Sequence, residues 1–172
     1  MIEATQKKLR EARFFLRLLT RESFADVRDE PEAFEFFLNA FLSTARSVTF
    51  ALQYEEKDKY KAWFQTWFNK RTEEDQQLLN FVKVQRNYTE KRGGADFNVI
   101  LEDVPIAEVR TDDHGHPAYG FHWFGPPGTP PRVGLPVHFF ELSGDQKKVT
   151  SVCEQYVTIL SELVRDFTEV YS

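Results

Sequence analysis

Apolar residues recur at three- and four-residue steps in five stretches of the chain, at positions 2–20, 31–52, 60–68, 72–91 and 149–170. This spacing gathers them on one side of an α-helix, so each stretch predicts an amphipathic helix. The second stretch is apolar on more than one side, which a helix requires when neighbours pack around it. The pattern therefore predicts a helical bundle.

Short signals mark where some of these helices begin and end. Pro31 stands where the first turn of the second helix tolerates proline, and Thr72 followed by Asp75 has the form of an N-terminal cap. Gly93 and Gly94 are expected to end the fourth helix, because glycine readily takes the left-handed conformation found there.

Positions 96–142 break the helical pattern. β-Branched and aromatic residues occur there in short runs, separated by turn sequences such as the one at 112–115. We expect strands at 104–110 and 118–124 to pair around this turn, with a third strand at 133–141.

These elements predict one mainly α-helical domain over residues 1–172. Its fold is a bundle of about five helices with a small antiparallel β excursion before the last helix. The helical part spans 1–94, the β-rich excursion 95–142 and the closing helix 145–171.

The composition restricts the class of protein. A chain of 172 residues can bury a hydrophobic core without disulfides or a structural metal, and the single cysteine, Cys153, leaves no internal disulfide to form. Cys153 stands among apolar residues of the last helix, as a small core residue does.

No leader and no long uncharged apolar run occurs, so we expect a cytoplasmic protein without a membrane partner. No cofactor-binding motif is present.

The charged residues are distributed unevenly along the chain. Residues 1–94 hold 17 Lys and Arg against 15 Asp and Glu, whereas residues 95–172 hold 5 against 12. Contact with a nucleic acid would therefore be local to the first part, where a basic cluster stands near the end of the fourth helix. The cluster comprises Lys83, Arg86, Lys91 and Arg92. The favoured interpretation is a solvated helix end, stabilised by the helix dipole.

Polar residues also interrupt the apolar second helix. Asn39, Ser43 and Arg46 share one stripe, with Ser47 beside it. They could line a polar pocket that faces Arg86, or form a buried hydrogen-bond network that specifies how the helices meet. The network is the favoured interpretation.

The histidines all fall in the β segment, at His114, His116, His122 and His138. His114 and His116 alternate, so they could share one strand face. No cysteine lies nearby and no zinc-ligand spacing occurs, which favours incidental histidines in a solvated turn over a metal site.

The order of two long helices, a shorter one and a fourth ending in the run Arg86 to Lys91 resembles the HEPN superfamily. The segment 40–50 is also similar to one in uncharacterised bacterial proteins of that kind. The resemblance covers about the first 90 residues and the last helix. It implies a homodimer whose paired helices present Arg86 and Asn87, and metal-independent cleavage of RNA in catalytic members.

In that chemistry an imidazole takes the proton of a ribose 2′-hydroxyl while a guanidinium holds the charge on phosphorus. Here Lys91 occupies the histidine position, and a lysine cation binds phosphate without accepting the proton. Glu90, or His114 or His116 of the β segment, remains as an alternative base. In the simpler alternative Arg86 pairs with a carboxylate, such as Glu90 or Asp75, and fixes the helix register.

These observations favour a non-catalytic or degenerate dimeric module that binds RNA or a protein. The catalytic candidates are Arg86, Asn87 and Glu90, and the candidates for binding RNA or phosphate are Arg86, Asn87, Lys91 and Arg46. A metal-independent ribonuclease, such as a toxin component, is the first alternative. The second is a structural interaction domain that uses the apolar residues of the β excursion.

Overall fold

A computed structural model describes residues 2–23, 32–105, 122–123 and 132–171 of the chain. It confirms a mainly α-helical fold with five helices and a small antiparallel sheet before the last helix. The elements are α1 (Glu3–Ser23), α2 (Ala33–Glu55), α3 (Lys57–Asn69), α4 (Glu73–Arg92), β1 (Asn98–Pro105), β2 (His122–Trp123), β3 (Arg132–Leu142), β4 (Asp145–Lys148) and α5 (Val149–Tyr171).

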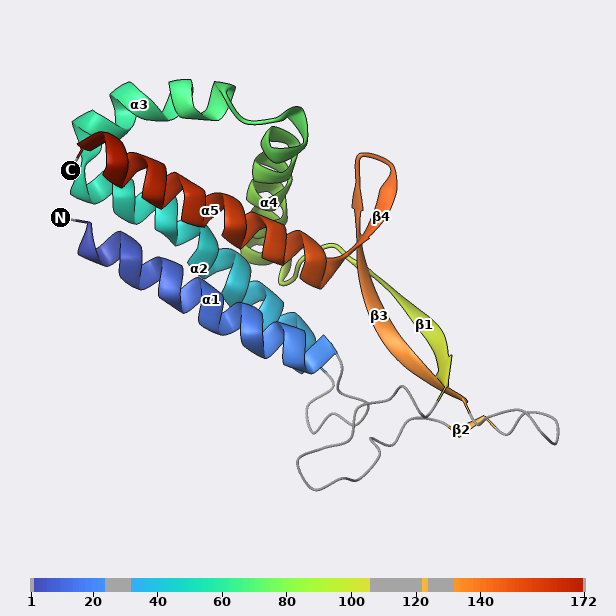
Figure 1. Ribbon diagram of the computed structural model, residues 1–172. Coiled ribbons are helices and arrows are strands. Elements are labelled where there is room, and N and C mark those ends of the chain that lie inside the picture. The colour runs from blue at the N-terminus through green and yellow to red at the C-terminus, as the bar shows by residue number, and fades with distance from the viewer. Residues whose placement is uncertain (1, 24–31, 106–121, 124–131, 172) are drawn as a thin grey trace.

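Three long helices form the body of the bundle. α1, α2 and α5 lie side by side, with α1 antiparallel to the other two, while α4 crosses them and the strands project away from the helices (Figure 1). The core between them is built largely from Leu, Val and aromatic side chains. The largest fully buried side chains include Phe34, Phe41 and Phe140. Burying such rings contributes about 1.5–3 kcal/mol each.

The predicted ends of the fourth helix are confirmed. The Thr72 hydroxyl oxygen accepts a hydrogen bond from the backbone N–H of Asp75 at 3.2 Å. At the other end Gly93 takes φ 89°, a left-handed conformation that a side chain would disfavour. Pro31, expected in the first turn of the second helix, lies outside the described residues.

The sheet has β3 at its centre. β1 pairs with β3 from Asn98 opposite Phe139 to Pro105 opposite Arg132, and β2 pairs with β3 where His122 lies opposite Val133. All of these pairs are antiparallel. The predicted third strand is thus confirmed within one residue at each end.

The expected pairing of 104–110 with 118–124 is wrong where the structure describes it. β3 lies between β1 and β2, so these two strands do not pair with each other. Val104 of β1 and His122 of β2 both lie opposite Val133 of β3. Turn residues suggested a hairpin, whereas β1 pairs along its whole length with β3, the longest strand of the described sheet. The remainder of both predicted strands lies outside the described residues.

A short strand that the sequence analysis did not predict follows β3. β4 pairs with β3 through a tight turn at Ser143 and Gly144, whose φ angles are 56° and 87°. Two successive positive φ angles are typical of a two-residue β-hairpin. The hairpin leads directly into α5, which returns to the bundle and buries ten residues against it. α5 therefore closes the core, as the sequence predicted.

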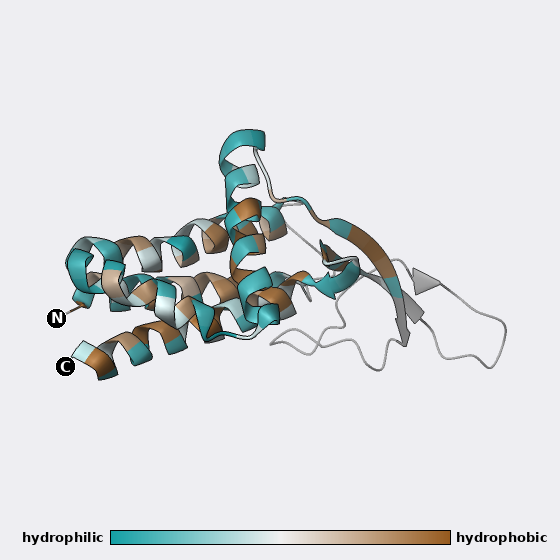
Figure 2. Cartoon of the chain, turned by 90° about the horizontal axis from the view of Figure 1, so that it is seen from above, coloured by the Kyte–Doolittle hydropathy of each residue, from teal (hydrophilic) through white to brown (hydrophobic). Residues whose placement is uncertain are grey.

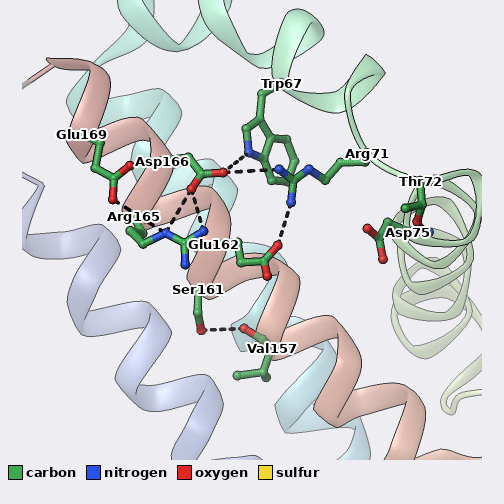
Figure 3. A network of polar contacts seen from close by, with 10 residues as sticks. All are labelled: Trp67, Arg71, Thr72, Asp75, Val157, Ser161, Glu162, Arg165, Asp166 and Glu169. Atoms are coloured by element: carbon green, nitrogen blue, oxygen red, sulfur yellow. Dashed lines mark hydrogen bonds and ion pairs between the residues drawn. The ribbon is translucent and has the colours of Figure 1, made fainter.

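A polar network fixes α3 against α5 (Figure 3). The indole N–H of Trp67 donates to Asp166 Oδ2 at 2.9 Å, and Arg71 Nη1 lies 2.6 Å from Glu162 Oε2. The Arg71 guanidinium also lies 4.7 Å from the centre of the Trp67 ring. These bonds attach the end of α3 and the residues after it to α5.

Candidate functional site: a basic pocket between four helices

A pocket of about 270 Å³ lies where α2, α3, α4 and α5 converge. Arg46, Thr49 and Gln53 line it from one face of α2, since they stand three and four residues apart. The other lining residues are Tyr60, Phe64, Gln65 and Phe68 of α3, Leu79, Asn80 and Lys83 of α4, and Tyr156 and Leu163 of α5.

The two cations of the pocket have no acidic partner among the described residues. Arg46 donates from Nη1 to Thr49 Oγ1 at 2.8 Å, and its guanidinium lies 4.5 Å from the Phe50 ring centre. Neither Arg46 nor Lys83 lies within 4 Å of a carboxylate in the part of the chain that the structure describes. None of the lining residues is acidic. The pocket is therefore locally basic in a protein whose net charge is -5.

Two buried tyrosines lie at the inner side of the pocket. Burial raises the pKa of Tyr156 to about 12, although the nearby Arg46 charge lowers it in part. Burial also raises the pKa of Tyr60, against the opposing effects of Gln53 and Arg46. Both hydroxyls therefore stay protonated at neutral pH and can donate hydrogen bonds.

The remaining wall is aromatic and polar. Phe64 and Phe68 are half-buried and lie 6.0 Å apart between ring centres, while Gln65 and Asn80 are exposed. The site thus combines two cations, hydroxyl and amide groups, and aromatic rings. Such a set can bind an anion attached to a flat or apolar body.

The predicted binding residue Arg46 lines this pocket, and Lys83 of the basic cluster joins it. The hydroxyls near Arg46 bond within their own helix: Ser47 Oγ donates to Ser43 O at 2.9 Å, and Thr49 Oγ1 donates to Arg46 O at 3.0 Å. These bonds do not bridge helices, so they do not form the network that the sequence analysis favoured.

Arg86 lies outside the pocket lining. It forms an ion pair with Glu90 one turn later, and its Nη1 donates to Asn87 Oδ1 at 3.5 Å. Lys91 is exposed. The structure therefore brings Arg86, Asn87 and Glu90 together and leaves Arg46 apart from them, in agreement with the simpler interpretation that Arg86 pairs along its own helix.

The remaining candidates are the histidines and Cys153. His138 is buried and stacks on Phe34, with 3.5 Å between ring centres. His114 and His116 lie outside the described residues, and the side chain of His122 is not described. Cys153 is buried, and burial raises the pKa of its thiol. Within the described residues, no group of three or more His, Cys, Asp or Glu could hold a metal ion.

A larger groove of about 450 Å³ runs between α1 and α5. Arg10, Arg13 and Arg165 line it together with Glu169. Its cations are partly engaged, because Arg13 donates to Ser161 and Arg165 contacts Asp166 at 2.9 Å. The smaller pocket has the stronger anion-binding chemistry, since no carboxylate lines it.

The fold and the site define a mainly α-helical protein with a basic, aromatic-lined pocket. The family model described as bacteriophage lambda protein ea47 matches residues 3–153, and the chain belongs to that family. No curated protein and no solved structure matches the chain.

This family membership corrects the resemblance to the HEPN superfamily, which was wrong. The match covers the segments 40–50 and 86–91 on which the resemblance depended. A helical bundle with an Arg-Asn pair near a helix end arises readily in unrelated proteins, because a dipeptide of common residues recurs by chance. The role of Arg86 and Asn87 in RNA cleavage was inferred from that resemblance alone, so it is no longer supported.

A helix that crosses a bilayer has to be both long and apolar. In the described residues, none of the helices has both the length and the apolar character needed to cross a membrane.

Proposed function

We propose that this chain is a non-catalytic binding protein whose pocket holds one nucleotide unit of its ligand. One observation carries the proposal: Arg46 and Lys83 face the same pocket without a carboxylate among its lining residues. An anion would complete the charge balance of the site. A phosphate attached to a flat base matches both the cations and the rings.

The phosphate would lie between Arg46 and Lys83. A guanidinium offers a planar pair of donors that matches two phosphate oxygens, and an ammonium adds a compact charge. Arg46 is half-buried, so water screens its charge less than that of an exposed arginine. Thr49 holds the guanidinium in place at 2.8 Å, which reduces the entropy lost on binding.

The base would lie against the aromatic wall. Phe64 and Phe68 offer ring surface, and stacking of a base on such a ring contributes about 1–3 kcal/mol. Gln53, Gln65 and Asn80 provide amide donors and acceptors for the edges of the base. A pocket of this size admits a single nucleotide rather than a duplex, so the proposal concerns free nucleotides or single strands.

The site is proposed to bind rather than to react. The tyrosines of its inner side are held protonated by burial, so they act as donors and not as bases near neutral pH.

Isothermal titration calorimetry with a nucleoside 5′-monophosphate, a single-stranded oligoribonucleotide and its deoxy counterpart tests this function. We expect binding that weakens with added salt. A preference for the oligonucleotides would identify a strand as the ligand, and equal affinity for the monophosphate would identify the free nucleotide. Tighter binding of the RNA would indicate contact with the 2′-hydroxyl.

Matched variants locate the binding. Arg46→Gln and Lys83→Gln should each weaken affinity about 10- to 150-fold, since each removes a charge-assisted hydrogen bond worth about 1.5–3 kcal/mol. Arg10→Gln removes a charge from the other groove and should leave affinity unchanged. Unchanged binding by both pocket variants, or no binding of any nucleotide ligand at millimolar concentration, would overturn the proposal. Capture of a protein partner by the wild-type chain alone would then favour a protein-binding module.

A further inference from the structure

β1 carries three consecutive exposed aliphatic side chains. Val99 is 53% exposed, Ile100 45% and Leu101 71%. Successive side chains of a strand point to opposite faces, so both faces of β1 are open at these positions. Figure 2 shows the hydrophobic colour along the strands that project from the helices. Helix packing within the protomer does not cover this segment.

β1 is also an edge strand in the described sheet. It pairs with β3 on one side only, and none of the other described strands pairs with its outer edge. Natural edge strands are usually protected by charged residues, proline or a bulge at the exposed positions. The apolar run 99–101 has none of these, and the charged residues and proline of β1 come only after it, at Glu102, Asp103 and Pro105. An edge that is both apolar and unpaired favours addition of another strand.

We infer that the outer edge of β1 pairs with β1 of a second copy of this chain, antiparallel and centred on Ile100. Around a two-fold axis, Ile100 then lies opposite the partner's Ile100, and Val99 opposite the partner's Leu101. Asn98 lies opposite the partner's Glu102, so its amide can donate to that carboxylate. Every described position of the segment from 98 to 102 thereby gains a compatible neighbour.

Other symmetric registers are less favourable. Centring the pair on Leu101 would place Ile100 opposite Glu102. Centring it on Val99 would pair only positions 98–100 of β1 with the partner strand and would leave Leu101 without an apolar neighbour. Centring it on Glu102 would bring two carboxylates together across the axis. Like charges directly opposite one another destabilise a sheet, and an aliphatic residue opposite a carboxylate loses its apolar contact. The sequence therefore selects the Ile100 register.

The interface would be modest in extent. A single strand pair buries less area than the roughly 1,200–2,000 Å² of a typical stable complex. The dimer should accordingly be reversible, with a dissociation constant in the micromolar range, and its formation should depend on concentration. The pocket between the helices is not part of this interface, so the ligand and the second copy use separate surfaces.

Sedimentation velocity over a range of about 1–200 µM tests the inference. The wild-type chain should move from monomer to dimer across that range. Ile100→Lys and Ile100→Asp place like charges opposite one another, so each variant alone should remain monomeric. An equimolar mixture should restore dimers, because lysine then faces aspartate across the axis. Recovery in the mixture also shows that both variants are folded.

Tyr54 provides the control, since it is 90% exposed on α2, away from the sheet. Tyr54→Lys should dimerise as the wild type does. Cysteine variants test the register: Ile100→Cys should form an intermolecular disulfide under mild oxidation, whereas Val99→Cys and Leu101→Cys should do so only when mixed with one another. The native Cys153 is buried and does not compete.

A wild-type chain that stays monomeric at 200 µM would overturn the inference, as would dimers of Ile100→Lys alone. Disulfides formed by Val99→Cys alone but not by Ile100→Cys would overturn the register.

Discussion

The carboxylate of Glu55, at the end of α2, caps the beginning of α1 through Thr5. Glu55 Oε2 accepts hydrogen bonds from the Thr5 hydroxyl at 2.6 Å and from the Thr5 backbone N–H at 2.9 Å. Its other oxygen accepts from the N–H of Ala4 at 2.8 Å. The first N–H groups of a helix have no partner within it, so Glu55 supplies one from a segment 50 residues away.

Glu55→Gln should destabilise the protein by about 1–2 kcal/mol at pH 7, since charge-assisted capping bonds become neutral ones. Urea unfolding measures the change. Glu154→Gln, on an exposed position of α5, is the matched control and should change stability by less than about 0.5 kcal/mol. A loss as large in the control would mean that net charge, not capping, is responsible.

The effect of Glu55 should depend on pH. Burial alone would raise its pKa, but the bonds from Thr5 and Ala4 lower it overall, below the usual value for glutamate. A carboxylate with a lowered folded-state pKa stabilises the protein above its unfolded-state pKa, and this contribution disappears as the pH falls through the folded-state value. The difference between wild type and Glu55→Gln should therefore be constant from pH 6 to 8 and shrink below about pH 4.5. A difference that grows on acidification would contradict this assignment.

Asp166 connects α5 to α3, and its removal should loosen the short helix. Burial opposes its ionisation, yet bonds from Trp67 and Arg165 and the charge of Arg71 lower its pKa overall. Asp166→Asn should cost about 1–3 kcal/mol, because it leaves Arg71 with one acidic partner instead of two. Glu169→Gln, which changes an exposed neighbour on the same helix, is the control.

The two variants can be distinguished by urea unfolding followed through tryptophan fluorescence. Because the Trp67 N–H bonds directly to Asp166, Asp166→Asn should also change the emission of the folded protein. Equal unfolding midpoints for the two variants would show that the network orients α3 without stabilising it.

Local patterns in the sequence predicted most of the fold. The helical period at Phe34, Leu38, Phe41 and Leu42 is a property of neighbouring residues, and these side chains are buried as expected. The cap at Thr72 was predictable for the same reason, since its partner is three residues away. β4 was missed because its sequence, Asp-Gln-Lys-Lys, is polar throughout and lacks the alternation that marks a strand.

The pocket could be predicted only in part. Arg46 was identified because a charged residue in an apolar helix is conspicuous, and Lys83 because of its basic neighbours. Tyr60 and Tyr156 each occupy a periodic apolar position of their helix, which predicts a core residue rather than part of a site. Their meeting at Arg46 depends on how α3 and α5 pack, and periodicity describes one helix at a time.

Binding of a nucleoside monophosphate should follow the ionisation of the ligand rather than of the pocket. Tyr156 has its pKa raised to about 12, so it remains a donor up to about pH 10. Affinity should be constant from pH 7 to 9 and fall below about pH 6, where the phosphate gains its second proton. Calorimetry across this range measures it. A loss of affinity between pH 7 and 9 would mean that a tyrosine titrates in the pocket.

Cys153 should report on opening of the core. It is 1% exposed among the apolar residues of α5, and burial raises the pKa of its thiol above the usual value. Only the thiolate reacts readily with disulfide reagents, so both lack of access and the raised pKa protect it in the folded chain. Modification should therefore be at least a hundredfold slower than in urea, and its rate should rise with urea in parallel with global unfolding.

Two variants separate local from global opening at Cys153. Glu55→Gln weakens the link between α1 and α2 and should accelerate labelling in proportion to its loss of stability, if labelling requires global unfolding. Val170→Ala shortens an exposed side chain near the end of α5 and should leave the rate unchanged. Rapid labelling of the wild type without urea would show that α5 separates from the bundle while the other helices stay folded. That result would also remove Tyr156 and Leu163 from the pocket in the open state, because both belong to the same helix.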